Sequence, residues 1–323
     1  MQHLAEMRAA GLLPARAEGW RGSGGASKVK VTVLQQLPKA GKAAAASLDT
    51  FLHTQLQRDG RKADILILPE NWLGASGHAD VATNSSLQLL ADVAKAHAVY
   101  ILAGTMAEVQ GGKRYVTSVL LAADGTMAGL YRKRKPTMEG AHDPGNEVGI
   151  FETPHGRIAV MICFDVENAD IFEETLSHDP VVILNPTWIP LPRVISTMPS
   201  VASPSCSYPL SLLTAWGNAM ETMSHKFENI CIERGIYLVR CDMPYNCATG
   251  TSQVIAPHYT AHAATLKETH LSVFLERDRE QMMKNHARFV GLFAPAERER
   301  TERRDRTGSR FGRVAKAASL SVT

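Results

Sequence analysis

The chain has 323 residues, of which 45% are hydrophobic and 21% charged, and its formal net charge is +3. This composition is ordinary for a soluble globular protein, and the small net charge does not indicate a nucleic-acid partner. Because no segment has the roughly 18–20 uninterrupted apolar residues of a membrane helix, we expect no membrane association.

The first 27 residues differ in composition from the rest of the chain. Residues 1–27 end in Arg-Gly-Ser-Gly-Gly-Ala-Ser, a composition typical of flexible linkers. We interpret this segment as a flexible N-terminal extension. Its several arginines leave an organelle-targeting peptide as an alternative.

From residue 28 onward, strand patterns alternate with helical patterns. Hydrophobic periodicity predicts helices over 43–56, 87–97, 169–177 and 209–234. Strands are predicted over 29–34, 64–68, 99–105, 115–121, 126–132, 157–163, 181–184, 236–241, 253–256 and 271–275. This order predicts an α/β fold with mixed sheets and helices on the outer faces.

No break in composition divides residues 28–285, so we predict a single domain there. Residues 286–323 alternate acidic and basic side chains, which is typical of a solvated, partly disordered tail.

The five cysteines are scattered and form no Cys-x-x-Cys pair. That pattern argues against a disulfide framework and predicts a reducing, cytoplasmic location. It also gives no zinc-ligand spacing, and His258 and His262 are interpreted as surface histidines. The sequence therefore predicts neither a metal site nor a cofactor.

Three reactive side chains each follow an apolar strand. Glu70 lies in Leu-Pro-Glu-Asn-Trp, Lys133 in Tyr-Arg-Lys-Arg-Lys-Pro and Cys163 in Met-Ile-Cys-Phe-Asp. Open α/β sheets place their sites at strand ends. A thiol can attack a carbonyl or nitrile carbon, a carboxylate can take its proton, and an ammonium can stabilise the oxyanion.

Each residue also has a plainer interpretation. Cys163 could be one of the many inert buried cysteines, and Glu70 a solvated loop acid. Lys133 lies in a basic run typical of a surface. Strand alternation nevertheless points it to the face opposite Arg132 and Arg134.

Taken together, these motifs resemble the nitrilase, or carbon–nitrogen hydrolase, superfamily over roughly 29–276. The segments 229–239 and 250–257 are similar to the family's late helix–strand and glycine–serine segments. The resemblance implies Glu70 as general base, Lys133 as oxyanion stabiliser and Cys163 as nucleophile. It also implies a four-layer α-β-β-α sandwich and a homodimer or larger homo-oligomer. The family's second glutamate corresponds to Glu139, with Glu147 as second choice.

The sequence also departs from the family. Many amidase members have an arginine four residues after the cysteine, whereas this chain has Glu167. Arg134-Lys135-Pro136 stands where a histidine and an apolar residue often follow the lysine. The Pro- and Ser-rich stretch 186–216 shows no family pattern, so the sequence leaves the substrate open.

The resemblance implies hydrolysis of a non-peptide C–N bond in a small amide or carbamoyl compound. We expect the backbone N–H of Phe164 to assist at the oxyanion. Thr187 and Trp188 are candidates to line the pocket, with core packing as the alternative for Trp188. Nitrile hydrolysis and a catalytically silent binding or scaffold protein remain alternative functions. A papain-like cysteine hydrolase is disfavoured because no histidine lies in a suitable motif.

Overall fold

The computed structural model describes residues 28–39, 41–73, 79–136, 142–188, 227–244, 252–257, 259–263, 268–276 and 278–284. The predicted N-terminal extension and the charged tail lie outside these residues. Among the described helices, none is both long and apolar enough to cross a bilayer.

The first sheet has seven strands in the order β13-β1-β2-β3-β5-β4, with β6 paired to β5. The bounds are β1 Lys28–Gln35, β2 Ile65–Ile67, β3 Tyr100–Leu102, β4 Met106–Gln110, β5 Lys113–Leu121, β6 Met127–Arg132 and β13 Thr269–Glu276. β1, β2 and β3 are parallel, and β13 and β5 flank them in antiparallel pairing. The sheet is therefore mixed, as predicted.

The second sheet has six strands in the order β12-β11-β10-β9-β8-β7. The bounds are β7 Ile150–Thr153, β8 Gly156–Val160, β9 Val182–Pro186, β10 Tyr237–Cys241, β11 Gln253–Ala256 and β12 Tyr259–His262. β8, β9 and β10 are parallel, and the outer pairs are antiparallel. This sheet is also mixed.

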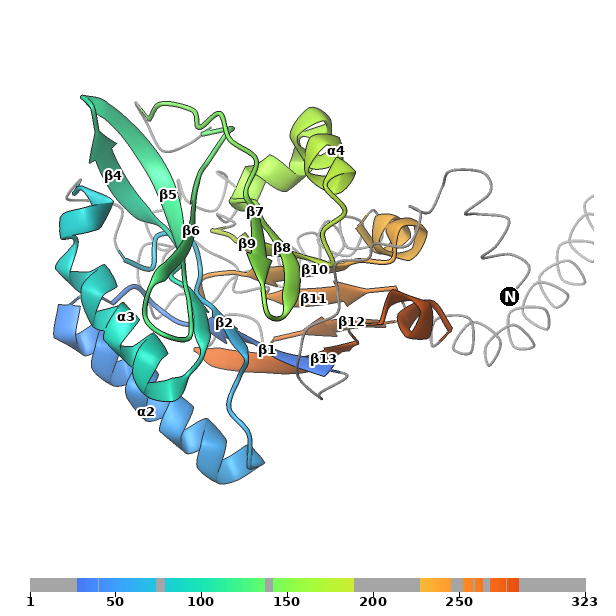
Figure 1. The fold of residues 1–323 in the computed structure, drawn as a ribbon, viewed down its shortest axis with the longest axis horizontal. Helices are drawn as coiled ribbons and strands as arrows, with labels where there is room; N and C mark the ends of the chain where they lie inside the picture. The colour runs from blue at the N-terminus through green and yellow to red at the C-terminus, as the bar shows by residue number, and fades with distance from the viewer. Residues whose placement is uncertain are drawn as a thin grey trace, which may run out of the picture.

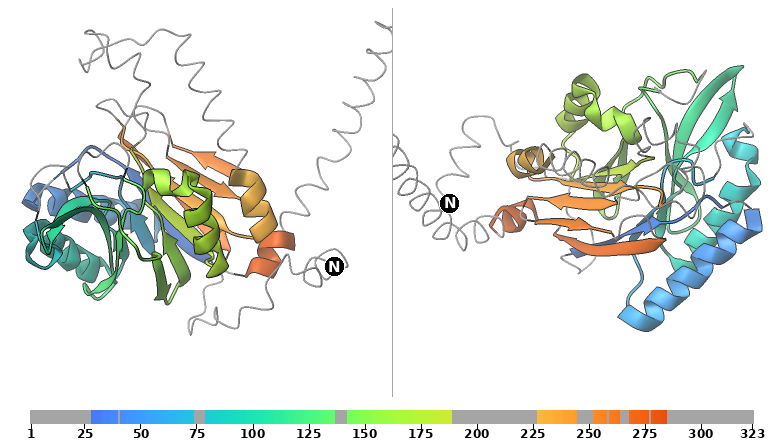
Figure 2. Two further views of the ribbon diagram at one scale, coloured as in Figure 1. Left: turned by 90° about the horizontal axis from the view of Figure 1, so that it is seen from above. Right: turned by 180° about the vertical axis from the view of Figure 1, so that it is seen from behind.

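Helices cover the outer face of each sheet. α2 (Gly41–Asp59) and α3 (Ser85–His97) lie side by side over the first sheet in Figure 1. α4 (Ala169–Ser177) and the helix at 227–234 pack on the second sheet, and Figure 2 shows them on the opposite side of the molecule. A third apolar cluster fills the space between the sheets. This is the predicted four-layer α-β-β-α sandwich.

Alternation along β1 shows how the sequence produces these layers. Val29, Val31 and Val33 point into the core between the sheets, whereas Leu34 packs in the cluster under α2 and α3. Successive strand side chains point to opposite faces, so β1 contributes to both clusters, and the buried polar side chains of Lys30, Thr32 and Gln35 interrupt its apolar pattern.

Several elements differ from the sequence prediction. The strand expected at 99–105 ends at Leu102, and Gly104 takes a positive φ of 68°. β4, β7 and β12 were not predicted, and η1 (Val81–Thr83) and η2 (Cys163–Glu167) are short 3₁₀ turns. Of the helix predicted over 209–234, only 227–234 lies within the described residues, and it is helical.

Candidate active site

The three reactive side chains meet where the two sheets face each other. Glu70 follows β2 and Lys133 follows β6 in the first sheet, whereas Cys163 follows β8 in the second. Lys133 Nζ donates a hydrogen bond of 2.8 Å to Glu70 Oε1. The charges of both residues act on the Cys163 thiol. The structure therefore brings together the triad expected from the sequence.

Glu70 is anchored to both sheets and is only 1% exposed. Its backbone N–H donates to Thr187 O at 3.2 Å, and its Oε2 accepts from Trp188 N at 2.9 Å. A Cβ at Gly104 would lie 2.3 Å from Pro69 O, so the turn that carries the glutamate needs glycine there. The interpretation of Glu70 as a solvated loop acid is therefore wrong.

Lys133 is the buried member of its basic run, with 2% of its surface exposed. Its neighbours are more exposed and have other partners: Arg132 pairs with Glu108 at 2.7 Å, and Arg134 with Glu174 at 2.6 Å. Lys133 therefore points into the protein, away from the face of Arg132 and Arg134, as strand alternation predicted.

Cys163 opens the turn η2 and is separated from the end of β8 by Met161 and Ile162, as expected for a nucleophile on a strand-to-helix turn. Its φ of +46° lies in the left-handed region, which side chains other than glycine rarely adopt. Its Sγ donates to Trp188 O at 3.7 Å, and its own carbonyl accepts from Asn185 Nδ2 at 3.3 Å. Such strain clusters at functional sites.

The surroundings of Cys163 favour the protonated form of its thiol. Burial raises the pKa of Cys163 above its ordinary value, the charge of Glu70 raises it further, and the ammonium of Lys133 opposes both effects. An uncharged thiol needs a base at the moment of attack. Burial also raises the pKa of Cys231 to about 12 and that of Cys241 well above the ordinary value. Of these three described cysteines, only Cys163 is partly exposed.

Asp165 connects the two segments that carry the lysine and the cysteine. Its buried carboxylate accepts from Tyr131 Oη at 2.8 Å, Lys135 N at 2.7 Å and Arg134 N at 3.3 Å. It also accepts from Ile162 N at 3.3 Å. Burial raises the pKa of Asp165, whereas these hydrogen bonds lower it. Sequence reasoning noted this acid in the motif but gave it no role.

Three of the four predicted substrate-binding residues, Phe164, Thr187 and Trp188, are described and lie next to Cys163 or contact Glu70. Phe164 is 44% exposed, directly after the nucleophile. Thr187 is fully buried, and its hydroxyl donates to Cys241 O at 3.3 Å, so it supports the neighbouring backbone. The indole N–H of Trp188 is buried and makes no hydrogen bond with the described residues. Contact of these residues with substrate stays a prediction.

The second glutamate cannot be placed: Glu139 lies outside the described residues, and its role stays a prediction. Glu147 is exposed, and its charge acts on Arg132.

A buried cation that the sequence did not reveal lies near the nucleophile. Arg240 in β10 is 4% exposed, and its Nε and Nη1 make no hydrogen bond with the described residues. Burial lowers the pKa of Arg240, and the negative charge of Glu167 opposes this effect. Four residues after the cysteine, where many amidase members have an arginine, this chain has Glu167. Its buried guanidinium near Cys163 instead comes from Arg240 on β10.

Comparison with known proteins points to one family. The sequence model of the carbon–nitrogen hydrolase family matches residues 28–187, a range that includes the whole triad. The omega-amidase NIT2 of Danio rerio is 27% identical over 162 residues, which cover 45% of this chain and 58% of that protein. The 2-oxoglutaramate amidase of Bacillus subtilis is 28% identical over 152 residues, which cover 43% of this chain and 58% of that protein.

The human omega-amidase NIT2 is 30% identical over 126 residues, 34% of this chain and 46% of that protein. The matches thus span about half the length of these curated relatives.

Solved structures share the fold at low sequence identity. A carbon–nitrogen hydrolase from Helicobacter pylori superposes with a TM-score of 0.65 at 16% identity, covering 82% of this chain and 94% of that one. An amidase from Nesterenkonia sp. superposes with a TM-score of 0.57 at 17% identity. The match covers 83% of this chain and 96% of that one. These likenesses extend well past residue 187, over the part of the chain that the family model does not match.

Proposed function

We propose that this chain, whose residues 28–187 match the carbon–nitrogen hydrolase family, hydrolyses the C–N bond of a small linear amide or carbamoyl compound through a covalent intermediate on Cys163. The observation that carries the proposal is the buried Glu70–Lys133 pair beside a thiol in a strained turn. That arrangement supplies a base, a cation and a nucleophile within one enclosed site.

The first half-reaction forms a thioester. Glu70 takes the proton of Cys163 as Sγ attacks the amide carbon, and the carbonyl oxygen becomes an oxyanion. Lys133 Nζ and the backbone N–H of Phe164 stabilise that charge. The tetrahedral adduct then collapses, the C–N bond breaks, and Glu70 returns its proton to the leaving ammonia or amine.

The second half-reaction restores the thiol. Glu70 takes a proton from water, whose oxygen attacks the thioester carbon. The C–S bond breaks, the carboxylic acid leaves, and the sulfur regains a proton through Glu70. The sum is amide plus water giving acid plus amine, so the reaction needs no cofactor.

The protonation state of the site supports a base mechanism. The raised pKa of Cys163 favours the protonated thiol. A carboxylate within reach of the thiol can therefore act as base during attack, as in other activated nucleophiles. The relatives named omega-amidase and 2-oxoglutaramate amidase favour an amide over a nitrile as substrate.

The test is ammonia release from a panel of small amides, nitriles and carbamoyl compounds, with wild type and Cys163→Ala compared. We expect wild-type turnover on at least one amide and none in the variant. Cys231→Ala is the matched control, because that thiol is buried away from the triad and its loss should leave turnover intact. Turnover on nitriles alone would replace the amide assignment. Equal ammonia release by wild type and Cys163→Ala would refute the enzyme and leave a binding or scaffold protein.

We also propose, by family resemblance, that the protein assembles as a homodimer or larger homo-oligomer. Light scattering of the full chain tests this: a mass of 35.2 kDa would contradict it. We also propose a reducing, cytoplasmic location, because the five cysteines are scattered along the sequence without a Cys-x-x-Cys pair.

A further inference from the structure

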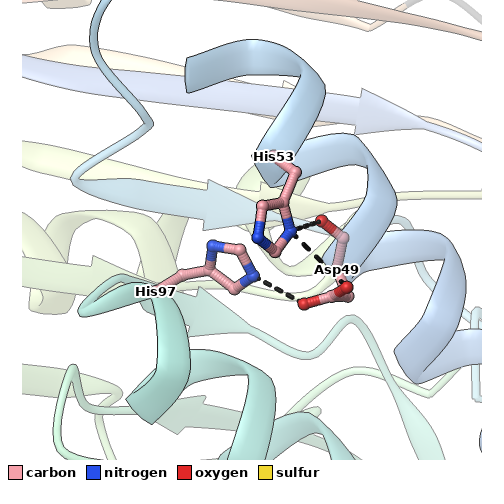
Figure 3. Close-up of side chains that lie close together, drawn as sticks. All are labelled: Asp49, His53 and His97. Atoms are coloured by element: carbon pink, nitrogen blue, oxygen red, sulfur yellow. Dashed lines mark hydrogen bonds and ion pairs between the residues drawn. The ribbon is translucent and has the colours of Figure 1, made fainter. Parts of the chain in front are cut away.

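A second polar cluster lies far from the triad, on the outer helical layer. Figure 3 shows Asp49 and His53 of α2 and His97 of α3 converging on one point. His97 Nε2 lies 2.8 Å from Asp49 Oδ1, and His53 Nδ1 lies 3.5 Å from Asp49 Oδ2. One ligand atom from each residue lies within 4.8 Å of the others.

Helix geometry explains the convergence. Asp49 and His53 are four residues apart, so they lie on one face of α2, one turn apart. His97 is the last residue of α3, and its buried ring meets the His53 ring edge-on at 4.7 Å between centroids. The aspartate and the second histidine are 48 positions apart in sequence, which explains why ligand spacing along the chain did not reveal the group.

We propose that Asp49, His53 and His97 bind a divalent transition-metal ion, with Zn²⁺ as the best match. Two imidazoles and one carboxylate are ligands that zinc commonly takes, and a tetrahedral ion needs neighbouring ligand atoms roughly 3.3 Å apart. The two separations of 2.8 Å and 3.5 Å lie on either side of that value. Binding would replace the present 3.0 Å contact of His53 Nδ1 with the carbonyl oxygen of Asp49. Solvent supplies the fourth ligand at the exposed His53 side.

Asp49 supplies the one carboxylate of the group. Within the described part of the chain, its ion-pair contacts are with His53 and His97, and no lysine or arginine lies within ion-pair distance of it. No permanent cation therefore competes with a metal ion for this carboxylate.

A bound ion would tie α2 to α3. The two helices already share an apolar cluster beneath the site. An ion that binds only the folded state stabilises it in proportion to the logarithm of its concentration over the dissociation constant. The inferred site is therefore structural and is independent of the proposed hydrolysis, which occurs between the sheets.

The experiment measures Zn²⁺ binding by calorimetry and thermal unfolding, and Co²⁺ binding by visible absorption. It uses the full chain with Cys163→Ala, because the reactive thiol would otherwise compete for the metal. We expect one zinc site assigned to these residues, a rise in melting temperature with added zinc, and Co²⁺ bands typical of tetrahedral coordination.

His53→Ala and Asp49→Asn are the informative variants, because both side chains are largely exposed and their loss should not unfold the chain. Each should weaken zinc binding at least about tenfold and abolish the thermal shift. His178→Ala removes another exposed histidine and should bind as the parent does. Wild-type zinc affinity and thermal shift in both His53→Ala and Asp49→Asn would overturn the proposal, as would the absence of zinc binding in the parent.

Discussion

Two opposite charges act on the same thiol. The carboxylate of Glu70 raises the pKa of Cys163 and the ammonium of Lys133 lowers it, with burial as the largest cause of the raised value. This balance favours a protonated thiol beside a base, and in the proposed mechanism the proton moves to Glu70 as substrate is attacked. The reactivity of the free thiol and its use in catalysis therefore depend on Glu70 in opposite directions.

Glu70→Gln should separate these two properties. Removing the carboxylate charge lowers the pKa of Cys163, so the thiolate fraction at pH 8 rises and alkylation by iodoacetamide becomes faster. Amide turnover should fall by about 10²–10⁴-fold because the base is gone. Mass spectrometry of the alkylated peptide and an ammonia assay measure the two effects on the same preparation.

Lys133→Met is the companion variant. It removes the charge that lowers the thiol pKa, so alkylation should shift to higher pH while turnover also falls, by about 10²–10³-fold for loss of one oxyanion donor. If both variants move the alkylation profile in the same direction, the assigned electrostatics are wrong.

At the scale of elements, Asp165 holds the turn η2 against the segment that follows β6. Four hydrogen bonds converge on this one buried carboxylate, including two from backbone N–H groups beyond Lys133. Asparagine at position 165 would turn its own N–H group toward backbone N–H groups that also donate, so at least one of these hydrogen bonds would be lost. We therefore interpret Asp165 as a positioning residue that fixes the distance between nucleophile and cation.

Asp165→Asn should lower kcat by about 10²-fold, as misplacement of about 1 Å can. The KM for the amide should change little, and the pH profile of Cys163 alkylation should shift because Lys133 moves relative to the thiol. Tyr131→Phe removes only one of the four hydrogen bonds and should have a smaller effect on each readout. Reduced stability with unchanged kcat and alkylation would show that Asp165 is only structural.

The element pattern was predictable where side-chain periodicity is strong. The alternation in β1 and the apolar stripe of α2 at Ala44, Leu48 and Leu52 identify those elements directly. β7 and β12 have only four residues each and pair at sheet edges, so their patterns are too short to read. The hydrogen bonds that join Glu70 to Trp188 N and Thr187 O depend on how the two sheets pack. No local sequence pattern encodes that packing.

At the scale of the whole molecule, both sheets contribute to one core. The central cluster contains Val31 and Leu102 of the first sheet and Val160 and Leu184 of the second. Since Glu70 and Lys133 come from one sheet and Cys163 from the other, this packing also sets the geometry of the site. The family resemblance predicted the four layers, which the order of elements alone could not distinguish from other mixed α/β folds.

Leu184→Ala should destabilise the protein by about 2–5 kcal/mol, the usual cost of a large-to-small change in a core. Because the sheets share the core, urea unfolding monitored by fluorescence and by circular dichroism should show one coincident transition. Leu56→Ala, at a site 42% exposed, is the matched control and should change stability by less than about 0.5 kcal/mol. Two separated transitions would contradict a single domain over 28–285.

The most direct test of the proposed function is intact-mass trapping of the acyl-enzyme. The full chain is mixed with each member of a library of small amides, nitriles and carbamoyl compounds and quenched in acid. Mass spectrometry measures the intact mass, and peptide mapping then locates the adduct. We predict an adduct equal to the acyl group on the peptide that contains Cys163, and none in Cys163→Ala. Turnover of an amide with no adduct on Cys163, and with full activity in Cys163→Ala, would contradict the account.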